Sequence, residues 1–167
     1  LEFLKRHNDV IAPAIGGLNP YHLGFRIFQD IEDRYGIDKL FVYQDEVYKN
    51  FNIDRAFNCM KDFIEREKPS VILYGGTSLG RSFAPKVAAY FKTGLTADCT
   101  SLGIKDNTDL VQVRPAFGGN IMAQIICTKT RPQMATVRYK IFKKPEKETP
   151  HGEVVYMSSK SINMKSA

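Results

Sequence analysis

The feature that most constrains the fold is a strongly apolar segment that runs directly into a glycine-rich turn. Residues 71–74 read Val-Ile-Leu-Tyr, and residues 75–81 follow with the sequence GGTSLGR. Consecutive apolar residues are typical of a central parallel strand that helices cover on both faces. A strand that runs into glycines and then a helix leaves backbone N–H groups free, and these suit an anionic or dinucleotide ligand. The segment therefore predicts an α/β layer with a ligand-binding edge.

Helical and strand patterns alternate around this segment. Apolar residues recur at helical spacing over 23–35 and 56–64, a short apolar strand is expected at 40–43, and a helix with a proline in its early turns is expected at 85–91. This order of elements favours an α/β layer in which the main sheet is parallel.

After Gly94 the pattern changes to short strands separated by turn residues. Strands are expected at 96–100, 110–114, 121–128 and 135–138, a hairpin-like connection at 105–109, and one edge strand at 154–157. The predicted fold class is therefore α/β, with a mostly parallel sheet, helices on both faces, and short antiparallel strands in the second half.

Size and charge exclude several classes of function. A chain of 167 residues is long enough for one ordinary domain and too short for two. The net charge of +6 could attract nucleic acid, but 18 acidic residues are interspersed among the 24 basic ones, so no nucleic-acid partner is expected. No apolar run approaches the roughly twenty residues of a transmembrane helix, so no membrane span is expected.

The cysteines and histidines predict no metal site and no disulfide framework. Cys59, Cys99 and Cys127 are odd in number and widely spaced, which is typical of small buried hydrophobic residues in a reducing compartment. No histidine lies near Cys99 in sequence to activate it, so it is not expected to be a nucleophile. The three histidines lack the spacing of metal ligands.

The turn at 75–81 does not match the common phosphate-binding motifs. It lacks the Gly-Lys-Ser/Thr ending of a P-loop, and its glycines are not spaced as in the dinucleotide fingerprint. One interpretation is a tight turn capped by Thr77 or Ser78. The other is a ligand-facing turn that uses Arg81, because an arginine in the first turn of a helix opposes the macrodipole and is expected to meet a carboxylate, a phosphate or a partner.

A second turn, RPAFGGN at residues 114–120, begins with an arginine at the end of a strand. The following proline biases Arg114 to an extended conformation, and Gly118, Gly119 and Asn120 fold the chain back. A planar guanidinium can lie over or beside a flat ring, and its charge would favour the anionic reduced forms of a flavin. The alternative for Arg114 is an ion pair with Asp98 or another acid.

Three further charged residues are candidates. Asp98 is expected to orient an arginine or a backbone turn. Arg131 and Arg138 bracket a short segment with the small residue Ala135, and they are interpreted either as anchors for a partner surface or as parts of a solvated edge strand.

Four segments, taken together, resemble one protein family. They are GGTSLGRSFAP at 75–85, TGLTADCT at 93–100, RPAFGGNIMA at 114–123 and RPQMATVR at 131–138. In this order they closely resemble the alpha subunit of electron transfer flavoproteins, a family that includes the FixB proteins. The resemblance covers about residues 36–142.

The resemblance implies an electron carrier rather than an enzyme. It implies a heterodimer with a beta subunit that relays electrons between acyl-CoA or other flavin dehydrogenases and an acceptor, in a bacterial cytoplasm or a mitochondrial matrix. The implied fold is an α/β layer related to adenine-nucleotide alpha-hydrolases. The implied cofactors are FAD, held mainly in a separate carboxy-terminal domain, and AMP or a second FAD in the beta subunit.

The matching residues are implied to border that second nucleotide. Arg114 is expected to lie closest to it, and the other candidates are Asn120, Ser78, Arg81, Gly118 and Gly119.

The domain organisation implied is an alpha amino-terminal domain at 1–145 and a tail or edge strand at 146–167 that leads toward the FAD-binding domain. The motif of that domain is not found in this sequence, and the opening segment lacks the family's usual first strand and helix. The chain does not begin with methionine, which indicates a fragment or a processed product.

Two alternatives stay open at this point. One is a free-standing adenine-nucleotide-binding domain or hydrolase that uses residues 75–81 as its phosphate turn, and the other is a structural interaction module.

Overall fold

The computed structural model describes residues 10–11, 39–43, 52–142 and 153–157. The chain divides into two compact units, which are treated separately. Unit 1 comprises Leu1–Ala14 and Glu67–Lys143, and unit 2 comprises Ile15–Arg66 and Lys144–Ala167.

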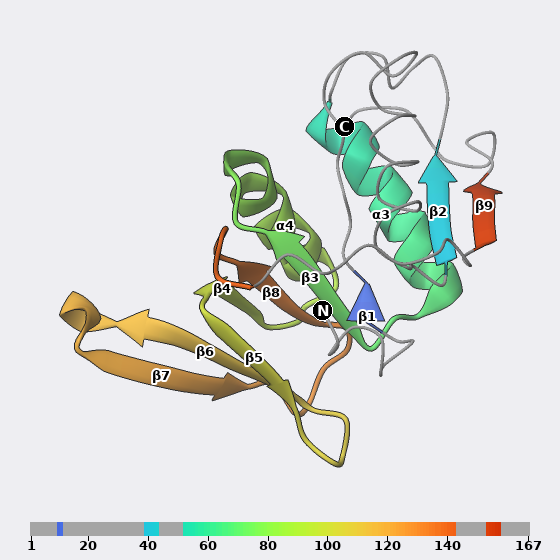
Figure 1. Ribbon diagram of the computed structural model, residues 1–167. Coiled ribbons are helices and arrows are strands. Elements are labelled where there is room, and N and C mark those ends of the chain that lie inside the picture. Colours follow the sequence, from blue (N-terminus) through green and yellow to red (C-terminus); the bar gives the residue numbers. More distant parts are fainter. Residues whose placement is uncertain (1–9, 12–38, 44–51, 143–152, 158–167) are drawn as a thin grey trace. The chain divides into compact units, whose positions relative to one another are not determined.

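Unit 1 contains a four-stranded parallel sheet (Figure 1). Its strands lie in the order β1 (Val10–Ile11), β3 (Val71–Gly75), β8 (Gln133–Val137) and β4 (Leu95–Cys99). The side chains of β3 from Val71 to Tyr74 are all buried, as their unbroken apolar sequence predicts. The predicted central parallel strand is therefore confirmed.

Helix α4 (Ser78–Tyr90) packs on β3, β4 and β8. It begins inside the glycine turn because Thr77 is its N-cap, and the Thr77 Oγ1 accepts a hydrogen bond from the Gly80 N–H at 3.1 Å. This cap starts the helix earlier than the sequence suggests. Pro85 consequently lies in the helix interior rather than in its early turns.

A three-stranded antiparallel sheet follows β4 and extends away from the parallel sheet (Figure 1). It comprises β5 (Ser101–Ile104), β6 (Leu110–Ala116) and β7 (Ile121–Ile126), and the 3-10 turn η3 (Phe117–Gly119) joins the last two. Strand β5 was not predicted as a strand of its own. Leu102 and Ile104 pack against the core cluster that includes Leu110 and Val71, and this burial holds the short strand in place.

Unit 2 contains α3 (Ile53–Glu67) and a parallel pair formed by β2 (Lys39–Tyr43) and β9 (Glu153–Met157). The rings of Phe41 and Phe63 meet edge to face with centroids 5.0 Å apart, and the Tyr43 hydroxyl donates a hydrogen bond to Asp62 at 2.9 Å. The structure therefore contains the two strands predicted at 40–43 and 154–157, and it contains the helix predicted at 56–64. The helix predicted at 23–35 lies outside the described residues.

The predicted fold class, α/β with mostly parallel strands and antiparallel strands in the second half, is confirmed. Two expectations are wrong. The opening segment does contribute a strand, since Val10 and Ile11 pair with β3. The segment between Arg131 and Arg138 is not a solvated edge strand, because β8 lies between β3 and β4. In the part of the chain that the structure describes, no helix has the length and apolar character required to cross a membrane.

Candidate functional site

The candidate site lies where β3, β4 and β8 reach their carboxyl ends, the edge at which open α/β sheets bind ligands. Two backbone bonds hold the chain together here. The Gly76 N–H donates to the Val137 carbonyl at 2.7 Å, and the Arg138 N–H donates to the Cys99 carbonyl at 3.0 Å. Side chains from three separate parts of the sequence therefore meet at this edge.

Asp98 binds two arginines at this edge. Its Oδ1 accepts a hydrogen bond from Arg81 Nη2 at 3.1 Å, and its Oδ2 accepts from Arg138 Nη2 at 2.6 Å and Nε at 3.2 Å. The hydrogen bonds from Arg138, helped by the charges of Arg138, Arg81 and Arg114 and opposed by burial, hold the pKa of Asp98 below its ordinary value. We call Asp98 together with Arg81, Arg114 and Arg138 the arginine cluster.

The backbone of Asp98 is unusual for a residue other than glycine. Its φ is +63°, and the register of β4 against β8 shifts between Thr96 and Cys99, as in a β-bulge. The Asp98 N–H donates to the buried Thr136 Oγ1 at 2.8 Å, which fixes this conformation. Of the two roles expected for Asp98, the orienting of an arginine is confirmed by its bonds to Arg81 and Arg138.

Arg114 reaches the same edge from β6. The Thr100 N–H donates to the Val113 carbonyl at 2.8 Å, so β6 runs beside the chain that leaves β4. Arg114 is half-buried and lies opposite the small residue Ala123. Among the described residues its guanidinium makes no hydrogen bond or ion pair, and the partner suggested for it, Asp98, is bound by other arginines.

Gln112 lies two positions before Arg114, so both side chains are on the same face of β6. Gln112 is fully buried, and neither its Oε1 nor its Nε2 has a hydrogen-bond partner among the residues that the structure describes. A buried amide without a partner costs about 1–3 kcal/mol, so such a group in a folded protein is unusual. Gln112 therefore leaves a donor and an acceptor unused in the interior, on the face of β6 that also carries Arg114.

The other predicted site residues lie elsewhere. Gly118 and Gly119, with φ of +71° and +81°, form the exposed tip of the β6–β7 hairpin, and Asn120 follows them. Ser78 is exposed at the start of α4, where its carbonyl accepts a hydrogen bond from Ser82 Oγ. The structure therefore brings together Arg81 and Arg114 of the predicted set.

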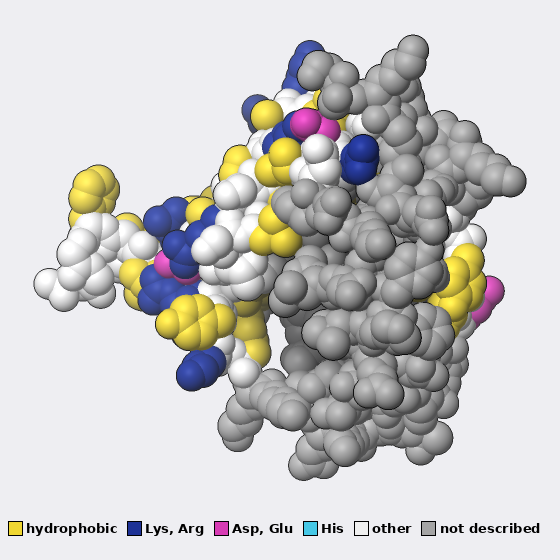
Figure 2. Space-filling model, turned by 90° about the horizontal axis from the view of Figure 1, so that it is seen from above, with side chains coloured by type: hydrophobic (Ala, Val, Ile, Leu, Met, Phe, Trp, Pro, Cys, Tyr) yellow, Lys and Arg dark blue, Asp and Glu magenta, His cyan; other side chains and the backbone are white. Residues whose placement is uncertain are grey.

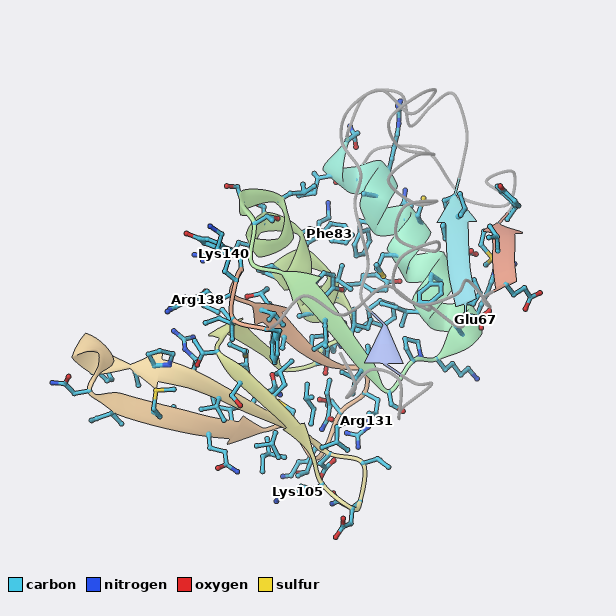
Figure 3. The ribbon with its side chains drawn as sticks, viewed as in Figure 1. Glu67, Phe83, Lys105, Arg131, Arg138 and Lys140 are labelled. Carbon is cyan, nitrogen blue, oxygen red and sulfur yellow. The ribbon has the colours of Figure 1, made fainter. Side chains whose placement is uncertain are left out.

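The far end of the hairpin is apolar. Phe117 is 95% exposed, Ile121 60% and Met122 55%. Figure 2 shows Lys and Arg side chains gathered around an acidic group, with a hydrophobic side chain projecting at the far end of the neighbouring hairpin. Figure 3 shows Arg138 at the end of β8 near Lys140, and Arg131 at the opposite end.

The turn at 75–81 uses its own polar groups internally. The N–H groups of Gly76, Gly80 and Arg81 are bonded to Val137, Thr77 Oγ1 and the Thr77 carbonyl, respectively. A Cβ on Gly80 would lie 2.0 Å from the Gly75 carbonyl oxygen, so this glycine permits a close contact within the chain. These findings favour the capped turn over a phosphate turn.

Sequence reasoning missed Gln112 and Thr136 as contributors to the site. The available signal for Gln112 was a polar residue between Leu110 and Arg114 on the apolar face of a strand. Cys99 is fully buried in the core, and burial raises the pKa of its thiol to about 11, as expected for a residue that is not a nucleophile.

Comparison with known proteins identifies the family. A model of the electron transfer flavoprotein domain matches residues 28–161. Subunit LctC of lactate dehydrogenase (NAD(+),ferredoxin) from Acetobacterium woodii is 56% identical over 135 residues, which is 80% of this chain and 32% of the relative. Electron transfer flavoprotein subunit alpha of Megasphaera elsdenii is 49% identical over 123 residues, 72% of this chain and 36% of the relative.

Protein FixB of Azorhizobium caulinodans is 38% identical over 122 residues, 72% of this chain and 33% of the relative. The chain belongs to the electron transfer flavoprotein family, and its resemblance to alpha subunits and FixB proteins is confirmed. The chain spans about a third of the length of these curated relatives.

Proposed function

We propose that this chain is the partner-facing domain of an electron transfer flavoprotein alpha subunit. In this role it pairs with a beta-type subunit, and the assembly relays electrons between a flavin dehydrogenase and an acceptor. The relatives named as alpha subunits, FixB proteins and an acryloyl-CoA reductase electron transfer subunit support this role. The chain itself makes and breaks no bonds in this proposal. Its residues hold a flavin in place and set its electrostatic surroundings.

The observation that carries the proposal is the unpaired guanidinium of Arg114 at the carboxyl edge of the sheet. The residues present fit the edge of a flavin ring. Arg114 supplies a half-buried planar cation beside the small Ala123. FAD, when bound, supplies one- and two-electron redox chemistry. Arg114 would hold its ring edge, with Arg81 and Ser78 further out.

A cation fixed beside a flavin favours the forms that carry more negative charge. Reduction adds negative charge to the ring, so Arg114 raises the reduction potential of the flavin that it borders. Each tenfold preference for the reduced form corresponds to about 1.4 kcal/mol.

We also propose a second FAD, rather than AMP, in the beta-type partner. The name of the Acetobacterium woodii relative gives two electron carriers of that protein, NAD⁺ and ferredoxin. An assembly that serves two carriers needs a flavin at which electrons can be divided between them, and a nucleotide without a redox ring does not provide one.

The apolar hairpin tip is proposed to contact the beta-type partner. Exposed aromatic and aliphatic side chains gathered at one place are typical of interaction sites, and Phe117 leaves almost its whole ring uncovered. Gly118, Gly119 and Asn120 would then lie in this contact, near the cofactor border that the sequence predicts for them.

Arg114→Ala in the full-length subunit, assembled with its beta-type partner, tests the proposal. We expect lower midpoint potentials for the bordering flavin, with partial recovery in Arg114→Lys. Lys105→Ala is the matched control, because Lys105 is an exposed cation in the loop between β5 and β6. Unchanged potentials in a folded, assembled Arg114→Ala variant would refute the assignment.

A further inference from the structure

We propose that Asp98 is a positioning residue that sets the positive charge presented at the carboxyl edge of the sheet. It holds Arg81 and Arg138 to itself and leaves Arg114 as the guanidinium offered to a flavin. This inference rests on the proposed function of Arg114, and it assigns the tuning of that site to a residue that does not touch the cofactor.

The geometry supports this role because one carboxylate ties together two elements of the fold. Arg81 belongs to α4, and Arg138 follows β8. The Arg81 Nε also donates to the Gly76 carbonyl at 3.0 Å, so its guanidinium is fixed on two sides. In the described part of the chain, the ion pairs of both arginines are made to Asp98.

The backbone conformation of Asp98 also supports its role as a positioning residue. Residues other than glycine rarely adopt the left-handed conformation, and they persist there only when their surroundings hold them. Here the bond to Thr136 Oγ1 and the bulge in β4 provide that hold. The bulge turns the Asp98 side chain toward Arg138 rather than along the regular strand direction.

The charge balance gives the expected direction of the effect. Three guanidiniums surround one carboxylate, and all three help to lower the pKa of that carboxyl group. Neutralising Asp98 removes the negative charge that offsets Arg81 and Arg138. This change makes the edge more positive, so a bordering flavin should become easier to reduce.

Asp98→Asn is the principal variant. Asparagine tolerates a positive φ and keeps a side-chain acceptor, so it removes the charge with little change of backbone. Asp98→Gly accommodates the same φ and removes the whole carboxylate. Asp109→Asn is the matched control, because Asp109 binds Arg131 beyond the opposite end of β8 and the change in net charge is the same.

The readouts are the flavin midpoint potentials of the full-length subunit in its assembled complex, together with its thermal unfolding. Both Asp98 variants are expected to raise the potential of the bordering flavin, opposite to the effect of Arg114→Ala. A tenfold gain in preference for the reduced form would appear as about 59 mV for a one-electron couple. Asp109→Asn is expected to leave the potential unchanged.

Different failures are distinguishable. If the Asp98 variants alter unfolding but not the potential, while Arg114→Ala still lowers it, Asp98 is only structural and the proposed function stands. If the Asp98 variants lower the potential, the inference is wrong in sign. If neither Arg114→Ala nor Asp98→Asn moves the potential, the proposed function fails, and this inference fails with it.

Discussion

The two ends of β8 each have an aspartate bound to an arginine, yet the pairs have different surroundings. Near the amino end, Asp109 accepts hydrogen bonds from Arg131 at 2.8 Å, Gln133 at 3.3 Å and Asn107 at 3.0 Å. The Gln133 side chain also accepts from the Leu110 N–H and donates to the Cys127 carbonyl. The Gln133 amide therefore uses both its oxygen and its nitrogen in bonds within the fold.

At the carboxyl end the aspartate is more open. The side chain of Asp98 is 24% exposed, compared with 7% for Asp109, and the Arg81 and Arg138 side chains are 53% and 40% exposed. The charge of Arg114 also acts on Asp98, and among the described residues the Arg114 guanidinium has no hydrogen-bond partner. The same ion-pair chemistry is therefore buried within the fold at one end of the strand and exposed at the other, where we propose that it faces a ligand.

The largest expected effect is on stability, at the amino end. Gln133→Leu removes the acceptor of the buried Leu110 N–H and leaves Asp109 with one donor fewer. We expect a loss of about 3 kcal/mol in the free energy of unfolding, because buried polar groups lose their partners. Urea unfolding measures this free energy, and Gln124→Leu is the control because Gln124 is exposed on β7. A loss below about 1 kcal/mol would show that the network is not important for the fold.

The second largest expected effect is on binding to the beta-type partner, at the tip of the β6–β7 hairpin. Phe117→Ser is expected to weaken binding to the beta-type partner about thirtyfold, or about 2 kcal/mol, as for an aromatic anchor at an interface. Stability of the free chain should not change, because Phe117 is 95% exposed. Calorimetric titration of the two subunits gives the affinity, and Tyr90→Ser, which is also at an exposed aromatic position, is the control. Equal affinities of the Phe117→Ser and Tyr90→Ser variants would show that the hairpin tip is not part of the interface.

The smallest effect is on the pH dependence of stability. The hydrogen bonds from Arg138 and Arg131 lower the pKa values of Asp98 and Asp109, so each carboxylate stabilises the folded state at neutral pH. This contribution is present above the unfolded pKa and is lost as pH falls through the folded pKa. Urea unfolding between about pH 5 and pH 2 should therefore show falling stability.

The two aspartates should differ in this series. Asp109→Asn is expected to flatten the profile more than Asp98→Asn, because the side chain of Asp109 is the more buried of the two. The reverse order would mean that the carboxyl end contributes more to the fold than its exposure suggests.

The sequence predicted the parts of the fold whose signals are local. The apolar run of β3, the turn at 75–81 and the α3 pattern depend on neighbouring residues, and each is present. The central position of β8 was missed because Gln133 and Thr136 are polar. Their burial is tolerated only because their partners, Leu110 and Asp98, come from distant parts of the chain.

The candidate site was predicted only in part. Arg81 stood out because an arginine in the first turn of a helix opposes the macrodipole, and Arg114 because it ends a strand before a proline and a glycine turn. The Asp98 link between Arg81 and Arg138 depends on a bulge and a left-handed residue, which the sequence pattern does not reveal. Gly118 to Asn120 adjoin Arg114 in sequence, but the extended strand carries them to the hairpin tip.

The most direct test of the account is a structure of the full-length subunit assembled with its beta-type partner and FAD. The account predicts that the Arg114 guanidinium lies within hydrogen-bond distance, about 3.2 Å or less, of the edge of a flavin ring. It also predicts that Arg81 and Arg138 still bind Asp98 in that complex. An Arg114 side chain paired with an acid of either subunit, with no flavin beside it, would contradict the central claim.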